Sequence, residues 1–553
     1  MRKTIGLIPL FVIMVSSCAP KSNLETALET YMREAVDAWR FQGSVLVADG
    51  ETVLFEGGYG LADVEKMREN KPSTQFPIAS ITKVFTAIAV MHLVEQGKLD
   101  LDQPVTRYLR DYPPETGGRI AIRHLLSHTS GIPDFGQIPE FSEKARRARS
   151  LEEMLEMISS ERLLFDPGSR QHYSSSGYFL LGAIVEEVAQ KRYETYIRDH
   201  LAQPFGMHHT GLVPGPIGDG ERALEYYRGP EGGLDQAVAI TPTIAYSAGA
   251  LLSTVRDLHR LDRALADATI LEHSSLEMMT TPEQGEYGLG FAVRVWDGHR
   301  IVGHGGGAPG VSAVFERWPD EPLCVVVLSN VGGVLPQMIA DGLAAVALGR
   351  EPPTPTNKAP VPVDRDGLEE FEGAYEFKDG SLSVVSLVGD RLTERAPSGA
   401  PMPLFFESDD LAYYQLNLMS TIHFSRDELG EVSGYTARRS SLERSASKIL
   451  GEKADFAFCG QPVVEVGRSA LERYVGDYEM PPDWGVWSVE VDGGEIRVRS
   501  GELPPLTLLP LSESDFCIPA NGERVVFDID GGGNVAGLVH VGQPGRTYGF
   551  LLR

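Results

Sequence analysis

The stretch FPIASITKVFTAIAVMHLVEQGKL, from Phe76 to Leu99, joins a serine–lysine pair to an apolar helix. Ser80 and Lys83 are three residues apart and would therefore share a helix face. Apolar residues recur behind them at helical spacing, and Gly97 suits the position just beyond a helix end. A buried ammonium without a partner is costly, so Lys83 either reaches solvent or has a chemical task. The apolar positions are Ile81, Val84, Phe85, Ile88, Met91 and Val94.

Two interpretations of this pair follow. In the first, Lys83 approaches the Ser80 hydroxyl, burial lowers the lysine pKa, and the helix N-terminus favours negative charge on the serine oxygen. In the second, Ser80 caps the helix and Lys83 lies on a solvated face. The helix alone does not decide between them. A second Ser-x-x-Lys pair, Ser445 and Lys448, lies in a polar stretch and is interpreted as accidental.

Two further segments favour the catalytic interpretation. In GSRQHYSSSGYFLLGAIVEEVAQ, Tyr173 precedes serines that can cap an apolar helix, where a tyrosine of tuned pKa can relay a proton. In IVGHGGGAPGVSAVF, His304 precedes three glycines between two strands, which permits close approach of the backbone. A strand edge with bare N–H groups beside a nucleophile can bind an oxyanion. The alternatives are a packing aromatic for Tyr173 and a surface histidine for His304.

The composition of the chain limits which other functions are possible. The 553 residues are 42% hydrophobic, which is enough for more than one core. The formal net charge of −27 disfavours nucleic acid and other polyanions as partners. The sequence has neither a phosphate loop nor a dinucleotide fingerprint, so we expect no cofactor. His124 and His128 have the i, i+4 spacing of metal ligands, but without a third ligand nearby we interpret them as structural and expect no metal.

The N-terminus predicts a targeting segment, with a basic MRK start, the apolar run TIGLIPLFVIMV, and VSSC ending at Cys18. VSSC resembles the lipobox of bacterial lipoproteins. The resemblance implies that residues 1–18 are a signal peptide and that Cys18 is lipidated. The protein is then exported and membrane-anchored, in the periplasm or at the outer membrane of a bacterium. A plain signal peptide cut nearby is the alternative. The other cysteines are Cys324, Cys459 and Cys517, and a Cys459–Cys517 disulfide is left open.

Residues 24–350 alternate helical and strand patterns. The sequence predicts a β-hairpin around Asp49-Gly50, then a helical region, then strands of an antiparallel meander from Gly288. This order predicts an α/β domain, in which an antiparallel sheet is flanked by helices and carries a helical insert. The expected helices include Ile78–Gln96, Leu151–Ser160 and Gly177–Gln190, and the expected strands are GLGFAVRVW, HRIVGH, VSAVFERW and LCVVVLSN.

A proline-rich linker, residues 351–366, follows this domain, and the rest of the chain repeats itself. LEEFEGAYEF at Leu368 returns as LERYVGDYEM at Leu471, 103 residues later, and FSRDELGEVSG at Phe424 returns as FDIDGGGNVAG at Phe527 with the same offset. Two segments with one offset indicate a duplication. Their alternating strand patterns predict two small antiparallel β-barrels, residues 367–455 and 468–553.

Taken together and in this order, SITK, YSS and HGG resemble the SxxK, YxN and KTG-or-HxG motifs of the serine β-lactamase and penicillin-binding-protein superfamily. The likeness is to the branch of class C β-lactamases, D-aminopeptidases and family VIII esterases, and it also includes LLSHTSGIPDF, YSAGALLSTVRDLHRL and YGLGF. The resemblance implies a β-lactamase-like fold. It also implies that Ser80 is the acylated nucleophile and that Lys83 and Tyr173 form its general-base pair.

The same resemblance assigns the substrate-binding strand. His304 takes the place of the lysine of KTG, with Gly306 and Gly307 on the same strand. The backbone N–H groups of Ser80 and Gly307 would form the oxyanion hole. One position departs from the family, because the asparagine of YxN is Ser175 here. The C-terminal barrels resemble lipocalin-like modules that restrict access to the active site of such relatives.

We therefore expect an exported serine hydrolase that forms an acyl-enzyme with small esters or peptide-like amides. Ser175 weakens amide binding and His304 removes a fixed cation, and both changes favour esters. The alternatives are a D-aminopeptidase, DD-peptidase or β-lactamase, and a β-lactam or peptidoglycan binder that acylates without deacylating. A third alternative is an inactive scaffold whose barrels bind a partner, against which the intact Ser80, Lys83 and Tyr173 argue.

Overall fold

The computed structural model describes most of the chain outside the N-terminal segment. The described residues are 23–135, 150–212, 222–228, 233–237, 242–296, 298–334, 336–355, 365–378, 382–388, 391–395, 402–414, 417–439, 442–449, 466, 468–480, 486–492, 495–500, 506–512, 514–518, 523–529, 535–542 and 545–551. The predicted signal peptide with Cys18, most of the predicted linker, and Cys459 lie outside these residues.

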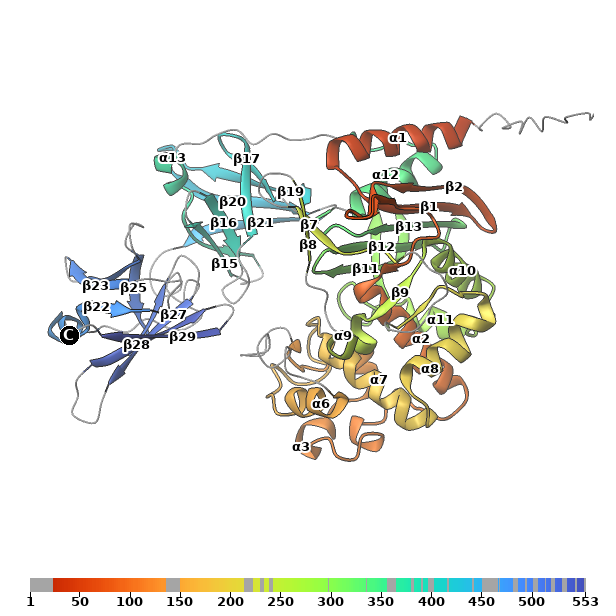
Figure 1. Ribbon diagram of the computed structural model, residues 1–553, viewed down its shortest axis with the longest axis horizontal. Coiled ribbons are helices and arrows are strands. Elements are labelled where there is room, and N and C mark those ends of the chain that lie inside the picture. Colours follow the sequence, from red (N-terminus) through yellow and green to blue (C-terminus); the bar gives the residue numbers. More distant parts are fainter. Residues whose placement is uncertain are drawn as a thin grey trace, which may run out of the picture.

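The predicted α/β domain is confirmed and contains one six-stranded antiparallel sheet, in the order β10-β11-β12-β13-β1-β2. Its N-terminal hairpin pairs with the last strand of the C-terminal meander, from Gly43 opposite Ser329 to Asp49 opposite Leu323. Helices α1 and α12 cover one face, and α10 and the helical region cover the other (Figure 1). The bounds are β1 (Gly43–Asp49), β2 (Thr52–Tyr59), β10 (Ala292–Trp296), β11 (His299–Ala308), β12 (Val311–Trp318), β13 (Leu323–Ser329), α1 (Asn23–Trp39), α10 (Val255–Ala266) and α12 (Pro336–Ala347).

The helical region lies between β2 and β10 in the sequence. It packs around α2, which begins directly after a short 3₁₀ turn, η1. The bounds are η1 (Ala79–Ile81), α2 (Thr82–Glu95), α3 (Pro114–Gly117), α4 (Ile122–Leu126), α6 (Leu151–Ser159), α7 (Ser175–Ala189), α8 (Tyr193–Ile197), α9 (Pro242–Gly249), α11 (His273–Met279), β3 (Leu61–Asp63), β4 (Arg68–Glu69), β5 (Phe76–Pro77), β6 (Gly211–Leu212), β7 (Tyr226–Arg228), β8 (Leu234–Gln236) and β9 (Leu251–Ser253).

Helix α2 is buried on all sides, which differs from the single apolar stripe that its sequence suggested. Every residue from Thr82 to Met91 is buried. The reason is its central position, since α7 and α9 pack against it and its apolar residues share one core cluster with residues of the sheet. Gly97 follows the helix with a φ of +66°, as predicted for the position beyond its end.

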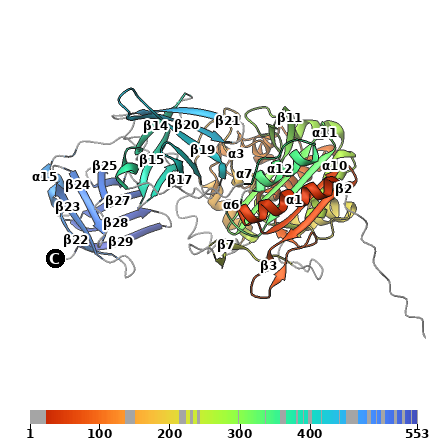
Figure 2. The ribbon, with the colours of Figure 1, turned by 90° about the horizontal axis from the view of Figure 1, so that it is seen from above.

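The two predicted β-barrels are also confirmed, each closed by eight antiparallel strands. The duplication extends to single contacts, because Tyr375 Oη donates to the Phe371 carbonyl at 2.6 Å and Tyr478 Oη donates to the Tyr474 carbonyl at 2.8 Å. The first barrel lies between the α/β domain and the second barrel (Figure 2). The bounds are β14 (Gly373–Phe377), β15 (Leu382–Val388), β16 (Arg391–Arg395), β17 (Met402–Ser408), β18 (Leu411–Tyr414), β19 (Asn417–Arg426), β20 (Val432–Arg439), β21 (Leu442–Ile449), β22 (Gly476–Glu479), β23 (Val486–Asp492), β24 (Glu495–Ser500), β25 (Leu506–Pro510), β26 (Asp515–Ile518), β27 (Glu523–Ile529), β28 (Val535–Gly542) and β29 (Gly545–Leu551).

Two cysteines lie in the described part of the chain. Cys324 on β13 is a free, buried thiol, whereas Cys517 on β26 is disulfide-bonded. None of the helices described here combines the length and the apolar character needed to cross a membrane.

Candidate active site

Ser80 and Lys83 meet at the junction of η1 and α2. Lys83 Nζ lies 3.1 Å from Ser80 Oγ, and the lysine side chain is fully buried with 0% exposure. Ser80 is not at an N-cap, since Ile78 and Ile81 hold those positions in η1 and α2, and Ala79 just before it has a φ of +44°, which is unusual for a residue with a Cβ. The interpretation with a capping Ser80 and a solvated Lys83 is therefore wrong.

The amine of Lys83 is held from a second side by helix α9. Lys83 Nζ donates to the Ala248 carbonyl at 2.8 Å. That carbonyl follows a kink in α9 at Tyr246, where φ is +35° and ψ is −130°. Burial lowers the pKa of Lys83 to about 7, and the nearby Asp134 carboxylate opposes this shift. A large fraction of Lys83 is consequently neutral near pH 7 and able to accept a proton.

Tyr173 lies directly above this pair, in the segment that leads into α7. Lys83 Nζ is 5.0 Å from the centre of its ring. Desolvation raises the pKa of Tyr173, interaction with the Ser80 side chain lowers it, and Asp134 adds to the rise. The phenol is therefore protonated at neutral pH. As a residue, Tyr173 is still 43% exposed.

His304 lies on β11 and is only 6% exposed. Its Nδ1 is 2.5 Å from the Gly305 carbonyl, so Nδ1 carries a proton, and its Nε2 then accepts from Tyr287 Oη at 2.8 Å. Burial, and secondarily the charge of Lys83, lower the pKa of His304 to about 3. The imidazole is therefore neutral, and both of its nitrogens are occupied within the protein. His304 occupies the position predicted for the lysine of the KTG motif, but it carries no positive charge.

The glycines after His304 bring β11 against the nucleophile. A Cβ on Gly306 would lie 2.3 Å from the Ile78 carbonyl, so only glycine allows this approach, whereas Gly307 is exposed with open space around it. Strand β10 pairs with β11 only as far as Gly303. Among the described strands, the edge of β11 beyond that point has no second neighbour. Its position beside η1 suits the predicted oxyanion hole.

Ser175 begins α7 and is half-buried. Its backbone N–H donates to Asp134 Oδ2 at 2.6 Å. The sequence suggested that the serine cluster caps this helix, but Ser174 at the N-cap makes no side-chain capping bond. The Asp134 carboxylate takes that role, which suits the positive end of a helix. This anion beside Lys83 and Tyr173 was missed, because nothing local in the sequence links it to α7.

Two more residues of the site were missed by sequence reasoning. His128 was considered only as a metal ligand, and Tyr287 was noted only within YGLGF. The structure places the His128 ring 4.2 Å from the Tyr173 ring and 4.5 Å from the Tyr287 ring, measured between centres. His124 is not part of the site, since its Nδ1 accepts from the Ala121 N–H at 3.2 Å. The described residues contain no cluster of three or more potential metal ligands.

The second Ser-x-x-Lys pair is accidental, as interpreted from the sequence. Ser445 and Lys448 lie on strand β21, where Ser445 Oγ is 3.1 Å from Thr436 Oγ1 and Lys448 Nζ donates to the Glu370 carbonyl at 3.0 Å. Residues three apart on a strand point to opposite faces. The pair therefore cannot act together.

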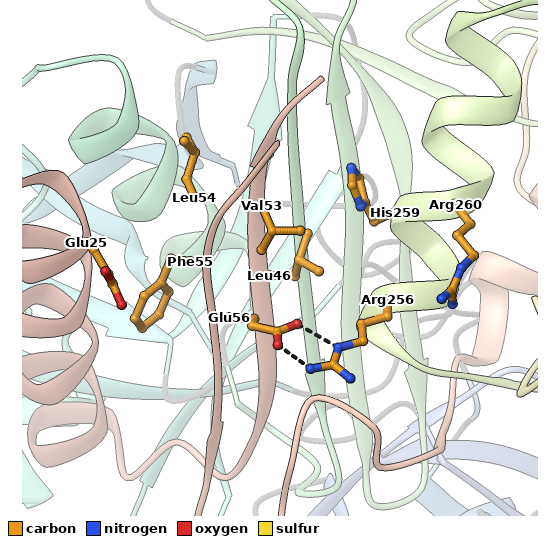
Figure 3. Close-up of a pocket in the computed structure, with 9 residues that line it drawn as sticks. All are labelled: Glu25, Leu46, Val53, Leu54, Phe55, Glu56, Arg256, His259 and Arg260. Atoms are coloured by element: carbon orange, nitrogen blue, oxygen red, sulfur yellow. Dashed lines mark hydrogen bonds and ion pairs between the residues drawn. The ribbon is translucent and has the colours of Figure 1, made fainter. Parts of the chain in front are cut away.

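A groove of about 520 Å³ lies elsewhere in the domain, around the edge strand β2 (Figure 3). Its basic side chains are paired, because Arg256 Nε donates to Glu56 Oε2 at 2.8 Å and Arg260 Nη1 donates to Asp257 Oδ1 at 2.7 Å. It shares no residue with the Ser80 site. The lining residues are Glu25, Leu46, Val53, Leu54, Phe55, Glu56, Arg256, His259 and Arg260.

Comparison with known proteins agrees with this geometry. The Beta-lactamase family matches residues 28–349. Penicillin-binding protein 4* of Bacillus subtilis is 26% identical over 434 residues, which cover 74% of this chain and 95% of that protein. The matched region extends beyond the α/β domain.

Two solved structures are similar. The octameric penicillin-binding protein homologue from Pyrococcus abyssi has a TM-score of 0.56 and 26% identity, with 76% of this chain and 99% of that chain covered. The D-amino acid amidase from Ochrobactrum anthropi SV3, in complex with L-phenylalanine amide, has a TM-score of 0.52 and 26% identity, with 59% of this chain and 98% of that chain covered.

Proposed function

Because the chain belongs to the beta-lactamase family, we propose that it hydrolyses small esters or peptide-like amides through an acyl-enzyme on Ser80. One observation carries this proposal. Lys83 Nζ lies 3.1 Å from Ser80 Oγ, and burial lowers the lysine pKa to about 7. A base with a pKa near the working pH is the most effective proton acceptor. The serine is thereby activated where a solvated lysine would remain protonated.

The proposed acylation uses the groups around Ser80 in turn. The hydroxyl proton of Ser80 passes to Lys83 Nζ while Oγ bonds to the substrate carbonyl carbon. The N–H groups of Ser80 and Gly307 bind the negative oxygen. Tyr173, protonated at neutral pH, gives its proton to the leaving oxygen or nitrogen and takes one back from Lys83. Water then attacks the ester of Ser80 with the same groups acting in reverse, which releases the acid.

The substrate class follows from the charges near Ser80. His304 is neutral and has both nitrogens engaged, so it offers no cation to a substrate carboxylate. The Asp134 carboxylate, which raises the pKa of Lys83 and binds the Ser175 N–H, does not favour a substrate carboxylate. Ser175 is too short to replace both functions of an asparagine amide. These features favour uncharged esters over β-lactams and peptides that end in a carboxylate.

We expect wild-type protein to have a higher kcat/KM on short-chain p-nitrophenyl esters than on a cephalosporin or a D-amino-acid anilide. Ser175→Asn should shift the ratio toward the amides by up to about tenfold, because one well-placed hydrogen bond contributes about 0.5–1.5 kcal/mol. Ser445→Asn, which changes an exposed serine on the first barrel, is the matched control and should leave the ratio unchanged. Steady-state kinetics on the three substrate classes measures this.

A second candidate function is supported by the similarity to the D-amino acid amidase. If wild type cleaves a D-amino-acid anilide faster than every ester tested, the amidase alternative replaces the ester preference. Faster turnover of the cephalosporin would favour a β-lactamase instead. Stoichiometric labelling of Ser80 without turnover would identify a binder that does not deacylate.

We further propose that the protein is exported and anchored through a lipid on Cys18. The support is the sequence VSSC after a basic and apolar start. In a bacterial host, wild type should sediment with the membrane fraction, whereas Cys18→Ala should not. Cys324→Ala, at a buried free thiol, controls for the general effect of losing a cysteine. Membrane association that survives Cys18→Ala would show that the anchor is not this cysteine.

A further inference from the structure

We propose that His128 is a positioning residue that holds Tyr173 in place for proton transfer at Ser80. The inference rests on the proposed function, because it assigns a role to a residue that serves Tyr173. His128 follows α4, on the loop Ser127–Ser130, and its side chain is only 1% exposed. It is 45 residues from Tyr173 in the sequence, so only the tertiary structure brings the two together.

His128 binds the backbone on both sides of Tyr173. Its carbonyl accepts from the His172 N–H at 2.8 Å, and its Nδ1 accepts from the Ser174 N–H at 3.1 Å. One residue thus binds the N–H groups of both neighbours of Tyr173. This reduces the freedom of the Tyr173 backbone, from which the phenol extends toward Ser80.

The ring of His128 supports the ring of Tyr173 as well. The ring centres are 4.2 Å apart with an interplanar angle of 36°, although Tyr173 as a residue is 43% exposed. Tyr178 and Tyr287 surround the imidazole, with ring centres at 5.1 Å and 4.5 Å. We infer that the imidazole, held between these rings, supports the Tyr173 ring in the observed orientation.

The protonation state of His128 follows from the same contacts. Because Nδ1 accepts a hydrogen bond, the proton of the neutral ring lies on Nε2, which is buried without a partner. A protonated ring would direct Nδ1–H at the Ser174 N–H and would lie near Lys83, and burial also disfavours it. His128 also has a φ of +58°, a conformation that asparagine tolerates better than most residues. A residue kept in an unfavourable backbone conformation, with a buried donor left unpaired, is typical of a functional site.

The test compares two substitutions that remove different parts of this arrangement. His128→Asn keeps an acceptor near the Nδ1 position and suits a positive φ, but it removes the ring. His128→Leu removes the acceptor as well. We expect kcat/KM on a p-nitrophenyl ester to fall about 10-fold for His128→Asn and about 100-fold for His128→Leu, since small misplacement of a reacting group has effects of this size. Titration of Ser80 with a fluorophosphonate gives the concentration of folded, active sites for each variant.

His124→Asn is the matched control. His124 lies one turn earlier, and its Nδ1 also accepts a backbone N–H, but that N–H belongs to Ala121 and not to the Tyr173 segment. The kcat/KM of His124→Asn per titrated site should stay within about twofold of wild type. A change of this size is well below the tenfold change in rate that corresponds to about 1.4 kcal/mol.

A double-mutant cycle with Tyr173→Phe separates positioning from general stability. If His128 acts through Tyr173, then substituting His128 in the Tyr173→Phe background should change kcat/KM less than threefold. A threefold change corresponds to roughly half a kcal/mol of residual effect. Equal losses in both backgrounds would overturn the proposal. So would an unchanged rate for His128→Leu. If Tyr173→Phe alone has no effect, the proposed mechanism fails instead, and the two failures are distinguishable.

Discussion

Ser80→Ala is expected to abolish turnover of every substrate and covalent labelling by a fluorophosphonate. The alanine variant lacks the oxygen that forms the acyl-enzyme, and loss of such a nucleophile lowers the rate by several orders of magnitude. Ser80 is half-buried and is not at the N-cap of η1 or α2, so the fold should survive its truncation. Mass spectrometry of the labelled protein, together with steady-state kinetics, measures both effects.

Ser445→Ala is the control for this prediction, because it alters the other serine that precedes a lysine by three residues. It lies on β21 of the first barrel and should leave labelling and turnover unchanged. A Ser80→Ala protein that retains wild-type activity would show that the acyl-enzyme mechanism is wrong.

Lys83→Met is expected to lower kcat by about 10²–10⁴-fold, the usual contribution of a general base. Methionine approximates the length of the lysine stem and carries no charge, so it fills the same buried space between Ser80 and α9. The melting temperature should not fall, since the substitution removes an amine whose charged form is penalised by burial. An unfolded variant would be recognised by circular dichroism, and full activity in a folded one would exclude Lys83 as the base.

The pH dependence of wild-type activity should also reveal the protonation of Lys83. Burial lowers the pKa of Lys83 to about 7, and only the neutral amine accepts the Ser80 proton. The value of kcat/KM should therefore rise with pH through about 7 and then level off. His304, with a pKa lowered to about 3, contributes nothing to this limb. A profile that is flat between pH 6 and pH 8 would contradict the assignment.

Sequence reasoning recovered the elements because their signals are local. The hairpin turn at Asp49-Gly50 and the helix end at Gly97 follow from the backbone preferences of glycine. The two barrels followed from a duplication with one offset, and motif order singled out Ser80, Lys83 and Tyr173, which the structure brings together. Helix α2 was incompletely described, because periodicity shows which positions are apolar but not how many neighbours surround the helix.

The chemistry of the site required the tertiary structure. The carbonyl that holds Lys83 belongs to Ala248, 165 residues away, and the backbone N–H that binds His128 is 46 residues from it. The neutral state of His304 depends on burial and on the charge of Lys83, neither of which its glycine-rich surroundings reveal.

The sequence by itself determined which groups are present and on which elements they lie, since those features depend on neighbours along the chain. Only the tertiary structure decided their protonation and orientation. The physical reason is that desolvation and charge act through space, so that a pKa depends on which distant residues exclude water and which charges they bring near.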